Sequence, residues 1–198
     1  AGMRTGHPID EAGWLRGGPL KIITDGSFTA QTAWCTHPYG DPDSGLDPHG
    51  SPSISREKLA TLMSRGELNG LQLAVHAIGD RAIAMTLDCF AETGASGSIE
   101  HAMVPSAADI ARMAELGLHA SVQPVHMLAD RELIEDSWPT GAERSFPLRS
   151  MLEAGVPLAF GTDAPVAPID PWLAIRTAVL RAVPGQEPWN ASESLSIA

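Results

Sequence analysis

Three polar side chains that could bind a metal ion occupy equivalent positions along the chain. His76 follows the apolar run 71–75, and His101 and Asp163 stand in the same place after two later strand-like runs. A short run of this kind followed by a turn is typical of a buried parallel strand, and α/β proteins place their chemistry just past the carboxyl ends of such strands. Imidazole and carboxylate groups bind zinc, iron, nickel or manganese. Together the three residues predict a metal site at one rim of a sheet.

Each of these residues also has a simpler structural interpretation. A single histidine at a strand end is as often a hydrogen-bonded structural residue, and Asp163 could cap a turn. The sequence Gly161-Thr162-Asp163-Ala164-Pro165 nevertheless leaves room for a ligand close to the backbone. A carboxylate there can bind a metal and accept a proton from an activated water, so Asp163 is the predicted catalytic residue.

Lys21 lies inside the first apolar run, at residues 20–24. A lysine in such a strand normally extends its ammonium group to solvent or pairs with an acid. Near a cation the neutral amine is favoured, and it can react with carbon dioxide to give a carbamate that bridges two metals. Asp25, in the turn that follows, is the alternative acidic group of this region. We therefore include Lys21 in the predicted metal site, with carboxylation as one form of it.

The elements that must position these residues alternate regularly. Apolar runs predict strands at 20–24, 71–75, 97–100, 118–122 and 156–160, separated by helices at 56–65, 79–92, 107–116 and 146–153 and followed by a helix at 170–181. This alternation implies right-handed crossovers and a parallel sheet, here about five βα units of a partial (β/α)8 TIM barrel. An open doubly wound sheet is the alternative, but it would carry its chemistry at one switch point. Residues 27–53 and 124–145 are predicted to be long loops.

Composition narrows the class of protein. The chain has 198 residues, 43% of them hydrophobic, which suits one domain with a sizeable core, and a formal net charge of −11, which disfavours a nucleic-acid surface. Its two cysteines have neither metal-ligand spacing nor a disulfide framework, which favours a reducing compartment, so we expect the cytoplasm. No apolar run approaches about 18 residues, so we expect no membrane partner.

Five segments, in order, resemble the motifs of the amidohydrolase superfamily, and most closely those of amidohydrolase family 3, the group of long-chain amidases and formamide deformylases. The segments are Lys21–Ser27, Val75–Ala82, Ile99–His101, Ala120–His126 and Phe160–Pro165. The resemblance extends from about residue 15 to residue 198. It implies a metal-dependent (β/α)8 barrel with a β-sandwich built from both termini.

The resemblance also implies roles for individual residues. His76 and His101 would be the metal ligands after the fifth and sixth strands of the barrel. Asp163, after the eighth strand, would be both a ligand and the general base. Lys21, at the fourth strand, matches the position that is often a carboxylated lysine bridging two metals.

Substrate contacts are expected around this centre. Gln123 and His126 follow the strand that would be the seventh in the barrel, and Asp25 and Arg81 lie in the turns after the fourth and fifth. For Arg81 a solvated or structural role is the alternative.

One departure from the family pattern concerns the His-x-His pair that the family carries after its first strand. This sequence contains no His-x-His. We therefore expect residues 1–198 to be a single fragment of the barrel domain, without its N-terminal strands and β-sandwich. The complete protein would bind one or two divalent metals, most simply zinc, and the fragment alone would be inactive.

The leading hypothesis is a hydrolase of carbon–nitrogen bonds outside peptides, such as amides, formamides or cyclic amides, that acts through metal-activated water on a small-molecule substrate. The alternative is a non-catalytic regulatory protein that retains the barrel. A sugar- or nucleotide-binding domain is disfavoured because no Gly-rich phosphate-binding turn follows any strand. A homodimer is a candidate assembly.

Overall fold

The sheet is a single run of five parallel strands. The computed structural model describes residues 2–39, 45–138, 142–183 and 185–197. Within these ranges the strands pair in chain order, β1-β2-β3-β4-β5, and every neighbouring pair is parallel. Their bounds are β1 (Leu20–Ile23), β2 (Leu73–Ala77), β3 (Gly97–His101), β4 (His119–Val122) and β5 (Leu158–Phe160). A strand order that never reverses confirms the predicted partial barrel and excludes the doubly wound alternative.

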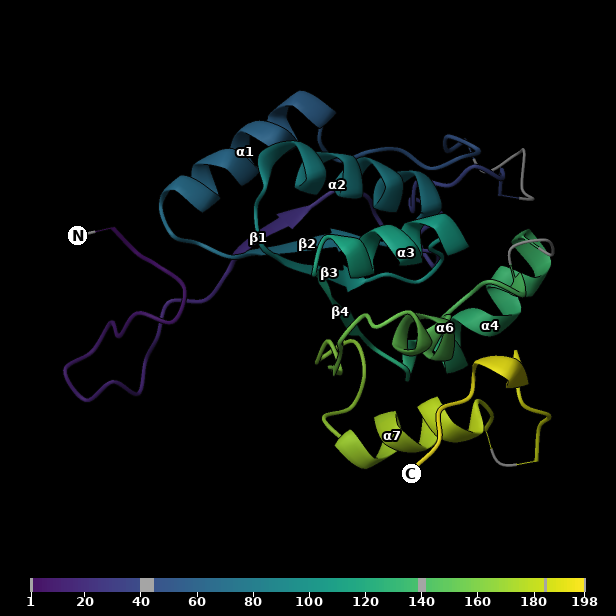
Figure 1. Cartoon of the computed structure of the whole chain (residues 1–198). Helices are drawn as coiled ribbons and strands as arrows, with labels where there is room; N and C mark the ends of the chain where they lie inside the picture. Colours follow the sequence, from purple (N-terminus) through teal and green to yellow (C-terminus); the bar gives the residue numbers. More distant parts are fainter. Residues whose placement is uncertain (1, 40–44, 139–141, 184, 198) are drawn as a thin grey trace.

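Helices follow the strands, and the first three of them cover one face of the sheet. Their bounds are α1 (Arg56–Leu68), α2 (Asp80–Thr93), α3 (Ala107–Glu115), α4 (His126–Ser137), α6 (Leu148–Glu153) and α7 (Pro171–Leu180), followed by the 3₁₀ helix η1 (Ala191–Glu193). Figure 1 shows α1, α2 and α3 side by side over the strands, and α3 in turn packs against α6. None of the helices within the described ranges is both long and apolar enough to cross a membrane.

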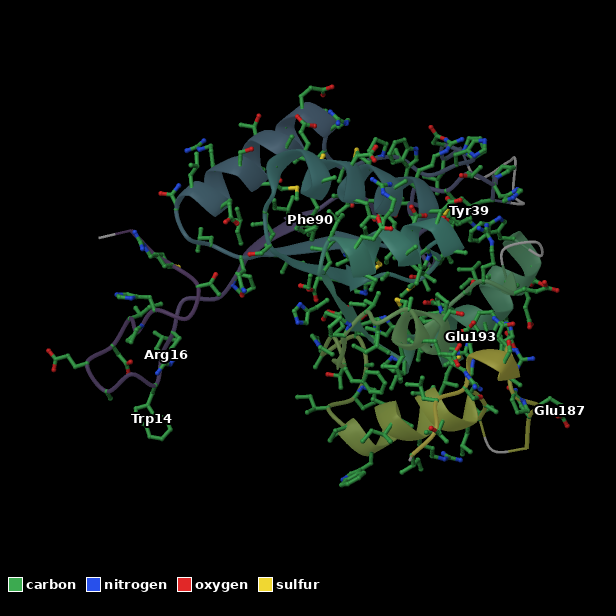
Figure 2. The ribbon with its side chains drawn as sticks, in the orientation of Figure 1. Trp14, Arg16, Tyr39, Phe90, Glu187 and Glu193 are labelled. Carbon is green, nitrogen blue, oxygen red and sulfur yellow. The ribbon has the colours of Figure 1, made fainter. Side chains whose placement is uncertain are left out.

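The core lies between the sheet and this helix layer. Ile22, Val75, Ile99 and Ala120 stand in register across four strands and are all buried. Helix α2 packs Ile83, Leu87 and Phe90 against this row, and Phe90 is visible between α2 and the sheet in Figure 2. Each such side chain contributes roughly 1.5–3 kcal/mol when buried. Because these residues face the helices, their immediate neighbours in each strand must face the other side of the sheet.

The opposite face of the sheet is more polar and more open. Ile23, His76, Glu100 and Ser121 stand in register one position along from the core row. Successive side chains of a strand point to opposite faces, so these residues face what would be the interior of a barrel. Lys21, two residues before Ile23, shares that face. The alternation of the strands thus places Lys21 and His76 on one side of the sheet.

The sheet does not close on itself within the described residues. β1 pairs only with β2, and β5 pairs only with β4. The N-terminal segment before β1 extends away from the sheet (Figure 1), held by an isolated antiparallel bridge between Pro8 and Arg16. Trp14 at its tip is 89% exposed (Figure 2). The sheet is therefore an open section of a barrel with two free edges.

The predicted boundary between α1 and β2 was wrong. Helix α1 continues through Gly66 to Leu68, and β2 begins at Leu73, so His76 lies inside the strand. A Cβ on Gly66 would lie 3.2 Å from Leu73, so this glycine allows the helix to pack closely on the sheet. Gly70, with φ of 71°, makes the left-handed turn between α1 and β2.

The predicted loop 124–145 is also corrected, because α4 occupies His126–Ser137. Its buried residues Met127 and Ile134 are two helical turns apart, and Arg131 pairs with Glu135 at 3.2 Å. These spacings are helical, and the polar residues between them masked the pattern. Residues 139–141 of that interval, and 40–44 of the predicted loop 27–53, lie outside the described residues.

Candidate metal centre

The residues predicted from the strand ends surround one cavity of about 730 Å³. Lys21, His76, His101 and Asp163 all line it, and His126 lines it as well. They come from β1, β2, the end of β3, the segment after β5 and the start of α4. Because the strands are parallel and in register, their carboxyl ends meet at this one rim. The sheet thus brings together all four residues of the predicted metal site.

His101, His126 and Asp163 form the tightest group in the cavity. Each offers one ligand atom, and the three atoms lie within 4.8 Å of one another. The rings of His101 and His126 stack with centroids 6.0 Å apart and planes inclined by 20°. From the sequence we expected His126 to contact substrate, whereas the structure places it beside two predicted metal ligands. The missed helix α4 is what brings it there.

Two nitrogen atoms of this group lack hydrogen-bond partners. Nδ1 of His101 and Nε2 of His126 are buried, and neither has a hydrogen-bond partner within the described parts of the chain. A buried polar atom left unpaired costs about 1–3 kcal/mol. A cation bound between the two rings and the Asp163 carboxylate would satisfy both nitrogens. The donor set therefore fits a divalent metal ion.

Both histidines are held in the neutral form that binds metals. Burial lowers the pKa of His101 to about 3, and the nearby side chains of His76, His126 and Lys21 act in the same direction. Burial also lowers the pKa of His126, against the opposing effect of the Asp163 carboxylate. A metal competes with a proton for the imidazole lone pair, so depressed pKa values favour metal binding at neutral pH.

The backbone is strained at two of the three residues. His101 has φ of 73° and Asp163 has φ of 54°, in the left-handed region that side chains other than glycine rarely adopt. Such conformations cost of order 1 kcal/mol each and cluster at functional sites. By alternation along β3, His101 would face the helix layer, as Ile99 does. Its left-handed conformation ends this alternation, so the His101 side chain lines the cavity instead. The conformation thus places the side chain in the group.

His76 stands next to this group and is oriented by the turn after β1. Its ring meets that of His101 edge-on, with centroids 4.5 Å apart. Its Nε2 lies 3.2 Å from the carbonyl oxygen of Gly26 and 3.4 Å from Oδ1 of Asp25. A carbonyl oxygen can only accept, so Nε2 carries the proton in the neutral ring and Nδ1 keeps its lone pair. Metal-binding histidines are oriented in this way.

Asp25 is buried beneath the cavity. Its carboxylate accepts hydrogen bonds from the backbone N–H groups of Trp34 (2.9 Å), Ile78 (3.1 Å) and Gly79 (2.8 Å). The side chain is fully shielded from solvent and does not line the cavity. Asp25 therefore joins three segments of the chain under His76. Asp25 is not among the described residues that line the cavity, so its contact with substrate stays a prediction.

Gln123 and Arg81 also lie outside the cavity wall. Gln123 is buried, its Nε2 donates to the carbonyl oxygen of Ser121, and its side chain acts on His101, where it opposes the lowering of the pKa by burial. The Arg81 guanidinium lies over the ring of Trp34, 6.0 Å from its centroid. Asp130 of α4, which we did not single out from the sequence, does line the cavity. Asp130 lies four residues after His126, so a predicted helix at this place would have put both residues on one helix face.

Two known proteins match most of this chain in sequence. The chain is 35% identical over 206 residues to the protein LONG AFTER FAR-RED 3 of Arabidopsis thaliana, a match that covers 98% of this chain and 34% of that protein. It is 27% identical to the N-substituted formamide deformylase of Arthrobacter pascens, covering 92% of this chain and 34% of the enzyme. The chain spans about a third of the length of these relatives.

A solved structure and a family model complete the comparison. The crystal structure of an uncharacterized metal-dependent hydrolase from Pyrococcus horikoshii superposes with a TM-score of 0.82 at 31% identity, covering 91% of this chain and 38% of that one. The model of the amidohydrolase family matches residues 3–198. The chain therefore belongs to the amidohydrolase family, a family of metal-dependent hydrolases, as the ordered motifs of its sequence predicted.

Proposed function

We propose that the full-length protein hydrolyses carbon–nitrogen bonds outside peptides, in small-molecule amides or formamides, with the help of a divalent metal ion. The observation that carries the proposal is the convergence of His101, His126 and Asp163 in the cavity wall, with both imidazoles holding an unpaired buried nitrogen. The similarity to an N-substituted formamide deformylase supports the choice of bond.

We propose that His101, His126 and Asp163 hold the ion, with His76 and Lys21 as further ligands from the neighbouring strands. Zinc is the proposed metal because imidazole and carboxylate donors suit it. When bound, such a cation polarises a carbonyl oxygen and lowers the pKa of water. Lys21 lines the same cavity as the histidines, and this placement supports its proposed carboxylation.

The side chains themselves divide the remaining tasks. The Asp163 carboxylate, exposed at the cavity wall, would accept a proton from the attacking water and return it to the leaving amine. Asp25 and the Gly26 carbonyl orient the His76 ring by contacting its Nε2. The apolar lining, which includes Met103, would exclude bulk water from the reacting group.

We further propose that residues 1–198 are one part of a longer barrel protein and do not catalyse hydrolysis alone. The chain covers 34–38% of the relatives described above. The free edges of β1 and β5 support the same proposal, because a closed barrel leaves no strand edge unpaired.

An assay of the zinc-loaded full-length protein over a panel of N-formyl and N-acyl amines tests the proposal. We expect hydrolysis, and a drop in kcat of roughly 10²–10⁴-fold in Asp163→Ala, as for loss of a general base. Asp136→Asn, at an exposed acid on α4, is the control and should leave kcat unchanged.

Two results would contradict the proposal. An Asp163→Ala protein that hydrolyses at the parental rate would remove Asp163 from the mechanism. A folded, metal-loaded protein that hydrolyses none of the panel would favour the regulatory alternative.

A further inference from the structure

Asp130 is a buried carboxylate in the cavity wall without a protein partner. It lies on α4 and is 7% exposed. Within the described ranges its side chain makes no hydrogen bond or ion pair, and burial raises its pKa to about 6. A buried charge without a partner costs free energy, so such a group calls for an explanation.

The other buried carboxylates of the described chain are all paired. Asp25 accepts three backbone hydrogen bonds. Asp109 accepts from the N–H and hydroxyl of Ser106 in the capping box of α3, and Arg112 lies 3.9 Å away. Asp130 differs from both because it faces a cavity rather than a backbone turn. The natural partner of its carboxylate is therefore something that enters the cavity.

The surrounding wall indicates the kind of molecule. Apart from His126 and Asp130, the lining on and just before α4 and in the segment after Asp163 is apolar, formed by Val125, Leu128, Ala129, Val166, Ala167 and Pro168. The one lysine or arginine among the described lining residues is Lys21 on β1. An anionic group near α4 would meet the Asp130 carboxylate, and Arg131, the arginine of that helix, does not line the cavity and pairs with Glu135 instead. A neutral or cationic hydrogen-bond donor would instead be stabilised there.

The spacing on the helix relates this carboxylate to the metal centre. Asp130 follows His126 by four residues, so their Cβ atoms are neighbours on one helix face, about 5–6 Å apart. A molecule whose reacting bond lies against His101, His126 and Asp163 can therefore place a second group against Asp130. That second group would sit roughly one helical turn, about 5 Å, from the reacting bond.

We propose that Asp130 is a specificity-determining residue that binds an amine or ammonium group of the substrate, about one helical turn from the scissile carbon–nitrogen bond. The substrate class is then an amide or formamide with an apolar body and a second, cationic nitrogen. This inference rests on the proposed hydrolase function for the identity of the reacting bond, and on the cavity wall for the rest.

Two formamides of equal shape test the proposal on the zinc-loaded full-length protein: N-(3-aminopropyl)formamide, whose three-carbon spacer sets the two nitrogens about 5 Å apart, roughly one helical turn, and N-butylformamide. An ammonium–carboxylate hydrogen bond in a dry site corresponds to about a tenfold to hundredfold preference in kcat/KM. We expect the parent protein to prefer the ammonium compound by that factor. Asp130→Asn should lose the preference and change the butyl compound less than about threefold, and the exposed control Asp136→Asn should behave like the parent.

The outcomes separate this inference from the proposed function. Equal kcat/KM for both compounds in the parent, or a preference that survives in Asp130→Asn, would overturn the role of Asp130. If neither compound is hydrolysed, the proposed reaction fails, and the ratio of the two dissociation constants, measured by calorimetry for the parent and Asp130→Asn, decides the role of Asp130 independently. Circular dichroism and zinc content of each variant confirm that it is folded and loaded.

Discussion

The Asp25 carboxylate lies 3.4 Å from Nε2 of His76 and at the same time accepts hydrogen bonds from three backbone N–H groups. One of these donors, Trp34, belongs to the segment after β1, and the others, Ile78 and Gly79, lie between β2 and α2. A single buried acid thus links the fold of two adjacent βα units to the orientation of a histidine in the cavity wall.

Substitution of Asp25 should therefore affect stability and metal binding together. In Asp25→Asn one carboxylate oxygen becomes an amide donor that opposes the backbone N–H groups. We expect a loss of about 2–3 kcal/mol in unfolding free energy and about a tenfold weaker metal affinity. Urea unfolding and zinc titration against a chromophoric chelator measure the two effects. An Asp25→Asn protein with parental zinc affinity would show that Asp25 does not orient His76.

His101 should make the metal-free protein acid-sensitive. Its pKa is depressed to about 3 in the folded state, against an ordinary value of 6.5, so below pH 6.5 the unfolded chain binds more protons than the folded one. Stability contributed by neutral His101 is complete above pH 6.5 and declines as the pH falls toward 3, by up to about 1.4 kcal/mol per pH unit. Denaturant unfolding with chelator present at pH 7 and pH 5 measures it. His101→Gln should show a flatter dependence, and an unchanged slope would contradict the burial of a neutral imidazole.

The effect of Asp130 on the pH dependence of stability should be opposite to that of His101. Burial raises its pKa from 3.8 to about 6, so between these values the folded state binds more protons than the unfolded chain. The favourable contribution of the protonated acid is complete below pH 3.8 and is lost as the pH rises through 6. Asp130→Asn should therefore be more stable than the parent at pH 7.5, by about 1–2 kcal/mol after allowance for partial solvation. A less stable Asp130→Asn protein would indicate a stabilising partner for this carboxylate.

Arg181 should stabilise the segments that follow β4 without contributing to the metal centre. Its buried guanidinium donates to the carbonyl oxygens of Trp189 (2.6 Å), Phe146 (3.0 Å) and Ser145 (3.3 Å). Arg181→Met would remove these three hydrogen bonds from a buried region, and we expect a loss of about 3 kcal/mol or more in unfolding free energy. Arg176→Met, at an exposed position of the same helix, should change stability by less than about 0.5 kcal/mol. Equal unfolding midpoints for the two variants would refute this role.

The sequence was sufficient to predict the parallel sheet and the rim that carries the chemistry. The helix starts are likewise encoded by local residues: Ser55 and Asp170 cap α1 and α7, and Ser106 forms a capping box with Asp109. These signals are local, because a cap bonds to the backbone two or three residues along the chain.

The remaining features depend on contacts between distant segments. The role of Gly66 depends on the approach of Leu73 and Leu20 to helix α1, which no local pattern encodes. The grouping of His126 with His101 and Asp163 depends on the direction in which α4 leaves β4. Asp25 could be read as an acid in a turn, but its three backbone donors come from up to 54 residues away along the chain.

The metal content of the full-length protein tests the central claim most directly. Elemental analysis after purification and dialysis against zinc should show at least one tightly bound ion per chain in the parent. His126→Gln should lose an ion, because it removes one of three converging ligands, whereas His119→Gln, at an exposed histidine of β4, should retain the parental content. Equal metal content in the parent and His126→Gln would contradict the assignment of His101, His126 and Asp163 as the metal centre.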